Sequence, residues 1–419
     1  MLDIKFIRQN PEKVKEGCRK KGADIDISHL LEVDKKKREL LQAFEDMNAK
    51  KGSGTADIQK AGSKEEKDAI ILGMRELDRN SDRLNKDLKE TEKELDDLMY
   101  QIPNLPLDDV PVGKDENSNV VLKEVGKKTE FKFEPKSYLE IAEKLDLIDV
   151  ERAAKVAGTR FGYLKREAVL LEFALIRLAF DTLIKKGFVP VLPPVMLKSE
   201  MARGMGYLEQ ADANEAYYLP QDDLYLIGTA EQPLGTMHAN EVLSEKDLPK
   251  RYIGFSTCFR REAGAYGKDT KGIFRVHQFD KVEMFSFCKP SESQKEHQFF
   301  LEIEKGLMND LKIPYQILKI CTGDLGFPAA AKYDIEAWFP NQNRYRETHS
   351  TSNCTDFQAR RLNIRYKKKD GKLEFVHTVN GTVFSQRPLL AIIENYQQKD
   401  GTIVVPKVLQ KYLNLKVIK

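Results

Sequence analysis

A heptad-like repeat near the N-terminus constrains what this 419-residue chain can fold into. From Ile70 onward, seam positions recur at alternating steps of three and four residues for more than four heptads, and eight of the ten are apolar. The seam consists of Ile70, Met74, Leu77, Ser81, Leu84, Leu88, Thr91, Leu95, Leu98 and Ile102. This spacing predicts a coiled-coil helix, which the prolines of residues 102–106, IPNLP, bring to an end.

A second helix with the same spacing precedes this one, after a short helical lead-in that includes Asn10-Pro11. Its apolar positions are Leu30, Val33, Leu40, Phe44 and Met47, with Lys37 as the polar interruption. A Gly- and Ser-containing region, residues 52–63, separates the two helices, so they should form an antiparallel hairpin. At ~1.5 Å per residue, helices of about 35 residues would make an arm about 50 Å long. We therefore expect an N-terminal domain over residues 1–102, with the arm over residues 27–102.

The charge of the arm does not identify its partner. Residues 27–102 contain 15 Lys plus Arg and 18 Asp plus Glu. A hairpin of this length buries little surface against its own domain, so it should contact something else. A dimerisation coiled coil is the alternative to a binding arm.

Composition limits the class of protein further. The net charge is only +3, so any contact with nucleic acid must be a local patch. Five cysteines, with no C-x-x-C pair, argue against a disulfide framework and a structural zinc site and favour a reducing compartment. The charged N-terminus and the absence of any run of 18 apolar residues predict a soluble, cytoplasmic protein with no membrane segment.

A linker and a globular domain follow the arm. Residues 103–132 are rich in Pro, Asp and Asn, which is typical of a linker, and residues 133–419 should form the main domain. Helices are expected near residues 138–145 and 166–186, the second ended by Gly187. The next segment, residues 188–195, is a strand interrupted by prolines, so it should lie at a sheet edge or an interface.

Residues 258–287 are the most informative stretch of the main domain. They predict two strands joined by a long loop with three glycines. Arg260 and Glu262 are two residues apart and therefore project from one strand face, and the returning arm adds Arg275 and Glu283. Guanidinium forks beside carboxylates suit a ligand that carries both phosphate and ammonium groups. The alternative is a surface hairpin with charges paired across its strands.

Two further segments follow predicted strands. Thr229 and Glu231 lie at the end of one strand and could hold an ammonium group or simply cap a helix. Arg387 follows another strand and a turn, and opens an apolar helix.

These segments carry a resemblance to a known family. The pattern F-R-x-E, a Gly-rich loop and R-V-H-Q-F-x-K-V-E resembles the second motif of class II aminoacyl-tRNA synthetases, in its seryl-tRNA synthetase form. LIGTAEQPL, the Glu-x-x-Ser segment, the Arg387 segment and the arm follow the same family pattern in the same order. The resemblance covers nearly the whole chain and implies an α+β fold: an antiparallel sheet flanked by helices, with an N-terminal coiled-coil arm.

The resemblance also implies an activity and partners. Serine would be activated with ATP and Mg²⁺ to seryl-adenylate and transferred to the 3′ end of serine tRNA, and by family inference to selenocysteine tRNA. The arm would grip the long variable arm of the tRNA, and a homodimer would form through the first motif around Pro194. The tRNA-contact candidates are Lys35, Lys36, Lys37, Arg38, Lys50, Lys51, Lys60, Lys64 and Lys67.

The site residues are carried over motif by motif. The catalytic arginines would be Arg260 and Arg387. The serine-binding residues would be Thr229, Ala230, Glu231, Arg260, Glu283, Thr382 and Ser385. The ATP-binding residues would be Arg260, Arg261, Glu262, Arg275, Val276, Phe279, Glu347, Thr348, His349, Ser350 and Arg387. The Mg²⁺ ligands would be Glu347 and Ser350.

The sequence departs from the family pattern in two places. The family usually has Ser and Cys where this chain has His349 and Thr351, and a solitary histidine is more often a packed side chain than a metal ligand. The loop before Arg387 is one residue shorter than in the family. Thr382 and Ser385 are therefore both candidates for the residue that contacts the serine hydroxyl. Two alternatives stay open: a catalytically degenerate synthetase paralogue that binds RNA, and an amino acid ligase acting on a carrier protein, whose relatives lack the arm.

Overall fold

The computed structural model describes residues 1–209, 214–263 and 271–419, and of residues 53–60 the backbone alone. The chain divides into two compact units. The N-terminal unit comprises residues 2–19 and 23–103, and the C-terminal unit comprises residues 104–419 together with Met1 and residues 20–22.

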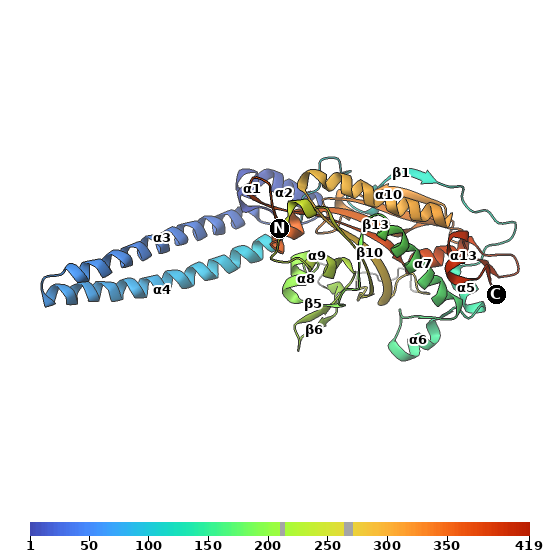
Figure 1. Ribbon diagram of the computed structural model, residues 1–419, viewed down its shortest axis with the longest axis horizontal. Coiled ribbons are helices and arrows are strands. Elements are labelled where there is room, and N and C mark those ends of the chain that lie inside the picture. Colours follow the sequence, from blue (N-terminus) through green and yellow to red (C-terminus); the bar gives the residue numbers. More distant parts are fainter. Residues whose placement is uncertain (210–213, 264–270) are drawn as a thin grey trace. The chain divides into compact units, whose positions relative to one another are not determined.

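The N-terminal unit is helical and contains the expected arm. It consists of α1 (Ile4–Gln9), α2 (Pro11–Lys20), α3 (Ile27–Lys60) and α4 (Lys64–Tyr100). Helices α3 and α4 lie side by side (Figure 1). Ser63 and Glu66 form a capping box that fixes the start of α4. Along α4 the buried positions are Ser81, Leu88, Thr91, Leu95 and Met99. Near the end of the seam, Met99 is buried in place of the expected Leu98. An α-helix has 3.6 residues per turn and therefore drifts against a 3.5-residue repeat, which moves the buried position by one residue.

An eight-stranded sheet forms the centre of the C-terminal unit (Figure 1). Its order is β1 (Val120–Val125), β11 (Tyr315–Lys319), β12 (Ala331–Phe339), β13 (Arg344–Thr355), β16 (His377–Ser385), β10 (Gln278–Cys288), β9 (Lys250–Phe259) and β4 (Val189–Val191). Every neighbouring pair is antiparallel except β4 with β9, which is parallel. The proline-containing strand β4 lies at the sheet edge, as its sequence predicts.

Helices and short strands complete the unit. The helices are α5 (Tyr138–Lys144), α6 (Val150–Ala157), α7 (Glu167–Ile184), α8 (Ser199–Met205), α9 (Glu231–Thr236), α10 (Ser293–Leu311), α11 (Phe357–Arg361), α12 (Gln386–Asn395) and α13 (Lys407–Leu413). The short strands are β2 (Ile148–Asp149), β3 (Tyr163–Leu164), β5 (Met196–Lys198), β6 (Tyr218–Leu219), β7 (Leu224–Leu226), β8 (Val242–Ser244), β14 (Arg365–Lys367), β15 (Leu373–Phe375), β17 (Ile403–Val404) and β18 (Val417–Ile418). The α+β class is therefore confirmed.

Alternation along the strands separates the two faces of the sheet. Val282 and Met284 on β10, and Val379 and Val383 on β16, join a core with apolar residues of α7, α10 and α12. The intervening residues of these strands point to the other face. Helices α7, α10 and α12 thus cover one face of the sheet. On the opposite face, Phe285 and Phe287 pack against residues of α8, α9 and α11, and polar side chains line the part that these helices leave uncovered.

Three smaller observations bear on the sequence-based expectations. The expected linker, residues 103–132, includes β1, which pairs with β11 in an antiparallel manner. All five cysteines are buried, and none of them forms a disulfide bond. No helix in the described ranges is both long and apolar enough to cross a bilayer.

Candidate active site

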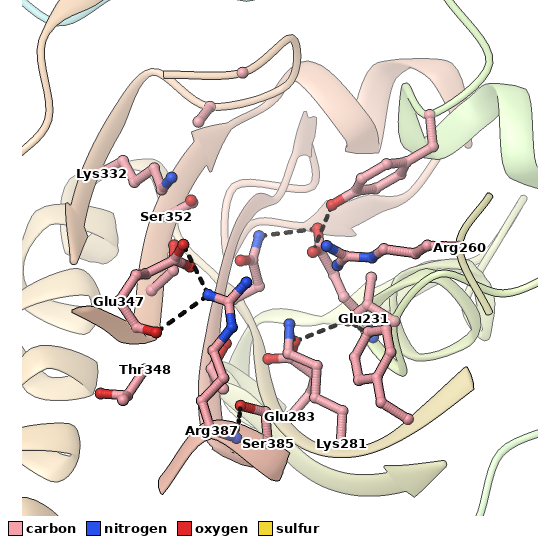
Figure 2. A pocket seen from close by; sticks show the side chains of 18 of the residues that line it. Glu231, Arg260, Lys281, Glu283, Lys332, Glu347, Thr348, Ser352, Ser385 and Arg387 are labelled. Carbon is pink, nitrogen blue, oxygen red and sulfur yellow. Dashed lines mark hydrogen bonds and ion pairs between the residues drawn. The ribbon is translucent and has the colours of Figure 1, made fainter. Parts of the chain in front are cut away.

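A cavity of about 450 Å³ opens on the uncovered part of the central sheet. The predicted site residues that line it are Thr229, Glu231, Arg260, Glu262, Arg275, Val276, Phe279, Glu283, Glu347, Thr348, Ser350, Thr382, Ser385 and Arg387. They come from β10, β13 and β16 and from the segments that flank β7, β9 and α12. Segments that are far apart in the sequence are thus brought together around one space (Figure 2).

Strand alternation explains why β10 contributes as it does. Phe279, Lys281 and Glu283 follow one another at two-residue steps and all line the cavity. The hairpin predicted from the sequence is present, with β9 and β10 antiparallel. It is closed at the cavity end by the Arg260 amide, which donates to the His277 carbonyl at 2.9 Å.

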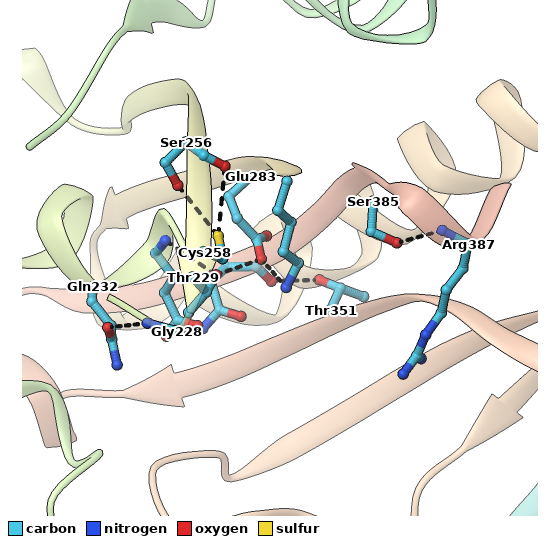
Figure 3. A network of polar contacts seen from close by, with 12 residues as sticks. Gly228, Thr229, Gln232, Ser256, Cys258, Glu283, Thr351, Ser385 and Arg387 are labelled. Carbon is cyan, nitrogen blue, oxygen red and sulfur yellow. Dashed lines mark hydrogen bonds and ion pairs between the residues drawn. The ribbon is translucent and has the colours of Figure 1, made fainter. Parts of the chain in front are cut away.

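One end of the cavity gathers acceptors for an ammonium group. Glu283 accepts a hydrogen bond from the Thr229 hydroxyl at 2.8 Å (Figure 3). Glu231 accepts from the Tyr207 hydroxyl at 2.6 Å and from the Asn380 amide at 2.9 Å. Burial raises the pKa of Glu231 to about 7, against the hydrogen bond from Tyr207. Two carboxyl groups at one end of a cavity form a site for a cation.

Lys281 extends into this acidic end of the cavity. Its ammonium group forms an ion pair with Glu283, and both side chains are largely buried. Lys281 lies between the Glu231 end of the cavity and the Arg387 end (Figure 2). The Lys281 ammonium group therefore contacts the Glu283 carboxylate. The ammonium group of a bound amino acid would compete with Lys281 for this carboxylate.

The opposite end of the cavity carries the groups suited to phosphates. The Arg387 guanidinium contacts the Glu347 carboxylate at 2.9 Å and donates to the Glu347 carbonyl at 3.1 Å. Burial opposes ionisation of Glu347, but Arg387 and Lys332 hold its pKa well below the ordinary value. The carboxylate is therefore charged at neutral pH.

A β-bulge explains how Glu347 and Ser350 can both face the cavity. Three residues apart on a regular strand, they would point to opposite faces. The register between β12 and β13 shifts at this point: His349 pairs with Ile335, and Glu347 pairs with Glu336, so Thr348 is the extra residue. The bulge turns Glu347, Thr348 and Ser350 toward the same cavity.

Lys332 adds a second cation at the phosphate end (Figure 2). It forms an ion pair with Asp334 at 3.4 Å. Burial disfavours its charge, but Asp334 and Glu347 more than compensate and raise its pKa. Lys332 thus remains a cation inside the cavity.

Aromatic rings complete the floor between the two ends. The Arg260 guanidinium lies 5.3 Å from the centre of the Phe279 ring, and its Nε donates to the Gly228 carbonyl at 3.1 Å. The Arg387 guanidinium lies 4.9 Å from the Phe274 ring. Arg275 pairs with Glu262 at 2.8 Å. Flat rings and guanidinium planes of this kind provide stacking surfaces for a planar base.

Thr382 and Ser385 occupy different parts of the site. In the pairing of β10 with β16, Thr382 lies opposite Glu283, whereas Ser385 lies opposite Lys281. The Ser385 hydroxyl caps α12 by accepting a hydrogen bond from the Arg387 amide at 3.4 Å (Figure 3). Thr382 therefore lies nearer the acidic end, and Ser385 nearer the phosphate end.

Three of the sequence-based site residues do not contribute to the lining described here. The Ala230 side chain is buried. The Arg261 guanidinium lies 5.8 Å from the Tyr217 ring, and its amide donates to the Glu215 carbonyl. His349 is buried against Phe384, and burial lowers its pKa to about 4, so it is neutral. Its position agrees with a packed side chain.

The arm residues predicted to contact tRNA fall into two groups. Lys37 pairs with Glu92 at 3.2 Å, and Lys51 pairs with Asp78 at 2.8 Å, so both cross-link α3 to α4. Arg38 pairs with Asp34, and Lys35 lies 3.8 Å from Glu39. The exposed lysines include Lys36, Lys50, Lys64 and Lys67. The side chain of Lys60 lies outside the described part of the structure.

Several cavity residues were not identified from the sequence. They include Tyr207, Phe274, Lys281, Lys332, Ser352, Asn380 and Gln386. Lys281 could have been identified from the sequence, because it lies two residues from both Phe279 and Glu283 and therefore faces the same side of the strand. Tyr207 and Lys332 could not have been identified from the sequence, because neither lies in one of the recognised motifs.

Comparisons with known proteins agree with this geometry. Residues 217–396 match the family described as tRNA synthetase class II core domain (G, H, P, S and T). Residues 1–106 match the seryl-tRNA synthetase N-terminal domain. Giardia lamblia prolyl-tRNA synthetase, at 18% identity over 65% of this chain and 54% of its own, has a TM-score of 0.57 and so shares the fold. The fold is thus that of a class II aminoacyl-tRNA synthetase.

The full-length relatives narrow the class to one family. The serine--tRNA ligases of Dictyoglomus turgidum and Thermobifida fusca are 44% and 45% identical, and the match covers all of this chain and 99% of each relative. The crystal structure of Pyrococcus horikoshii seryl-tRNA synthetase complexed with ATP is 42% identical, with a TM-score of 0.92 over 100% of this chain and 99% of its own. The chain belongs to the seryl-tRNA synthetase family.

Proposed function

We propose that the protein is a serine--tRNA ligase: it activates serine with ATP and transfers the seryl group to the 3′ end of serine tRNA. The observation that carries the proposal is one cavity with two carboxylates for an ammonium group at one end and two cations for phosphates at the other. Its relatives of 44–45% identity over the full chain are named for this reaction. The same reaction on selenocysteine tRNA is part of the proposal, because the transferred group is again serine.

Serine would bind at the acidic end of the cavity. Its ammonium group would lie between Glu231 and Glu283 and would release Lys281 from its pairing with Glu283. Its hydroxyl would meet Thr382, which lies opposite Glu283 in the sheet. A buried polar group that reads a hydroxyl rejects alanine strongly, because alanine would leave it unpaired. Threonine must be excluded by size, which is a weaker discriminator.

ATP would occupy the remainder of the cavity. The adenine ring would stack on Phe279, with Glu262 and Val276 near its edge. Arg260 would span the serine carboxylate and the α-phosphate, and the outer phosphates would contact Arg275, Arg387 and Lys332. Guanidinium forks bind phosphate oxygens bidentately, whereas Lys332 acts as a point charge.

The reaction then requires positioning and charge neutralisation. The serine carboxylate oxygen attacks the α-phosphorus, the bond to the bridging oxygen breaks, and pyrophosphate leaves with the electron pair. The carboxylate is already a nucleophile, so this step needs no base from the protein. In the second step the terminal tRNA ribose hydroxyl attacks the seryl carbonyl, and AMP leaves.

The donor set beside Arg387 fits Mg²⁺. Glu347 and Ser350 offer hard oxygen ligands, and the nearby Asp334 has a buried carboxylate oxygen without a hydrogen-bond partner among the described residues. When bound, Mg²⁺ would neutralise charge on the phosphates and take its other ligands from them and from water. Glu347 and Ser350 are the proposed ligands.

Partners beyond the substrates are proposed from surfaces. The outer face of α7 exposes Leu170 and Phe173, and the edge strand β4 exposes Val189, with Leu192 close behind it. An unpaired strand edge beside exposed apolar side chains favours an interface, here a homodimer that includes Pro194.

The arm formed by α3 and α4 is proposed to contact the long variable arm of the tRNA through its exposed lysines. Five reduced cysteines support a cytoplasmic location.

Serine-dependent exchange of pyrophosphate into ATP tests the activation step. Arg260→Ala should reduce the exchange rate by at least about 100-fold, because a guanidinium between the carboxylate and the α-phosphate stabilises charge that develops in the transition state. Arg261→Ala, whose side chain points outside the cavity, should stay within about threefold. Full exchange activity in Arg260→Ala would exclude the proposed role of that residue.

Transfer of labelled serine to tRNA separates the remaining alternatives. A degenerate paralogue would support neither exchange nor transfer, whereas the cavity keeps the charged set Arg260, Glu283, Glu347 and Arg387. A carrier-protein ligase would form the adenylate but would not charge tRNA. The full-length relatives and the arm favour tRNA charging over both alternatives.

A further inference from the structure

A second cavity lies next to the catalytic one and takes no part in the proposed reaction. Its volume is about 320 Å³, which is within the usual range for small-ligand sites. It is formed by α6, β3, the N-terminal half of α7 and the start of β10. Phe279 and Gln386 line both cavities, so a shared wall separates the two spaces.

Three acceptor groups line this second cavity. Glu172 on α7 is 9% exposed, and among the described residues it has neither a hydrogen bond nor an ion pair. Asp280 on β10 accepts from the Thr257 hydroxyl at 2.7 Å but meets no cation within the described ranges. The Gln386 side-chain oxygen is buried without a hydrogen-bond partner. Two carboxyl groups and an amide oxygen thus border one space.

Asp280 breaks the pattern of its strand. Along β10 the even-numbered positions Val282 and Met284 enter the apolar core under the helices, and Asp280 points to the same side. Burial raises the pKa of Glu172 to about 8, and Asp280 adds to the shift. A buried carboxyl group without a partner destabilises the fold, so a pair of them favours a ligand or another compensation.

The remaining walls are aromatic and aliphatic. Phe161, Tyr163 and Phe279 supply ring faces, and Val156 and Leu164 supply apolar surface. Tyr163 and Val156 are exposed and form the rim, so the cavity is open to solvent there. Ring faces combined with carboxylates are the usual surroundings of a bound organic cation.

We propose that this cavity, bordered by Glu172, Asp280 and Gln386, binds a small organic cation with several N–H donors on a flat or apolar body. An amidinium or guanidinium group matches it best, because its donors lie in one plane and can reach both carboxylates. The inference is independent of the proposed reaction, since the site shares only a wall with the catalytic cavity.

Benzamidine is the test probe, and neutral benzamide is its matched control. In calorimetric titration of the full-length protein at about pH 9, where Glu172 is ionised, and without ATP or serine, benzamidine should bind with a Kd at or below about 1 mM, and benzamide at least about tenfold more weakly. Glu172→Gln keeps the shape of the side chain and should weaken benzamidine at least about tenfold, the value of a charge-assisted hydrogen bond. Glu151→Gln removes one charge from the exposed part of α6 and should change nothing.

Serine-dependent pyrophosphate exchange checks that Glu172→Gln still folds, and it should match the wild type. Benzamidine binding that is unaffected by Glu172→Gln would place the cation elsewhere, for example in the catalytic cavity, and would overturn the proposal. Equal binding of benzamide, or no binding of either compound, would also overturn it. Loss of exchange activity in the wild type would instead count against the proposed function and leave the binding result intact.

Discussion

At the scale of single residues, Glu231 links the pH of the solution to serine binding. Burial places its pKa at about 7, and the serine ammonium requires its ionised form. Since kcat/KM reports the free enzyme, kcat/KM for serine should rise as pH increases through about 7 and then level off. Pyrophosphate exchange measured at subsaturating serine from pH 6 to 8 gives this profile.

Glu231→Gln should remove the inflection and lower kcat/KM by roughly 10- to 100-fold, because it deletes a charge-assisted contact. Asp223→Asn, an exposed carboxyl group outside the cavity, serves as the control and should keep the wild-type profile. An inflection near pH 7 that persists in Glu231→Gln would assign the titration to another group.

Thr382 and Ser385 provide a second test at the residue scale. Thr382 lies opposite Glu283, so Thr382→Val should raise the KM for serine by about 10- to 100-fold and leave the KM for ATP near its wild-type value. Ser385 caps α12, so Ser385→Ala should cost about 1 kcal/mol of stability and act mainly on ATP through Arg387. Steady-state exchange kinetics and denaturant unfolding distinguish the two. A reversed pattern would make Ser385 the reader of the serine hydroxyl.

At the scale of elements, helix α10 carries an unusual buried group. Glu304 is fully buried, and neither carboxylate oxygen has a hydrogen-bond partner among the described residues. A Cβ on Gly381 would lie 3.1 Å from one of these oxygens, so the glycine leaves room for the carboxyl group under the floor of the site. Burial raises the pKa of Glu304 well above its ordinary value, and Asp334 adds to the shift.

The sign of the resulting pH effect follows from proton linkage. The folded state keeps a proton on Glu304 that the unfolded state releases above pH ~4.5, so the folded state loses stability as pH rises toward the raised pKa. Glu304→Leu should therefore stabilise the protein by about 1–3 kcal/mol, with a larger gain at pH 8.5 than at pH 6. Urea unfolding at the two pH values measures it.

Glu302→Leu is the matched control on the same helix. Glu302 is half exposed and pairs with Lys305 at 2.6 Å, so its replacement should change stability by less than about 1 kcal/mol and give no gain that grows with pH. Destabilisation by Glu304→Leu at both pH values would mean that the carboxyl group has a favourable partner in the folded state.

The elements also determine how much of the site could be predicted from the sequence. Alternation along β10 directs Phe279 and Glu283 toward one space, because side-chain direction on a regular strand is a local property. Arg260 and Glu262 also line the cavity, but they follow the end of β9, so strand alternation does not explain their shared direction. The convergence of Glu347 and Ser350 depends on the bulge at Thr348, and a register shift against β12 cannot be read from β13 alone. Motif resemblance supplied both residues where periodicity would have separated them.

Tertiary placement accounts for the rest of what was missed. Tyr207 and Lys332 reach the cavity from segments without a motif, and their roles depend on neighbours such as Glu231 and Asp334. The arm helices α3 and α4 were predictable because a heptad seam is a local pattern sustained over many residues. The paired carboxyl groups of the second cavity, in contrast, become visible only once α7 is packed against β10.

At the scale of the whole molecule, the catalytic cavity and the arm that is proposed to bind tRNA belong to different units. Every described residue that lines the catalytic cavity lies within residues 104–419, and α3 and α4 belong to the other unit. Adenylate formation should therefore survive removal of the arm. Lys37 on α3 and Glu92 on α4 pair at 3.2 Å, so a short turn can join the two helices at this point.

We expect that replacing residues 38–91 by a short Gly-rich turn leaves serine-dependent pyrophosphate exchange within about twofold of the wild type. The same change should lower serine transfer to tRNA by at least about 100-fold, since phosphate contacts supply most of the affinity for nucleic acid.

Lys36→Ala combined with Lys64→Ala and Lys67→Ala should give an intermediate loss of transfer and a shallower dependence of transfer on salt, because fewer counterions are released on binding. Leu72→Ala, an exposed apolar position on α4, is the control for the point variants. Loss of exchange in the shortened protein would show that the arm supports the catalytic unit. Unchanged transfer would show that tRNA is held by another surface.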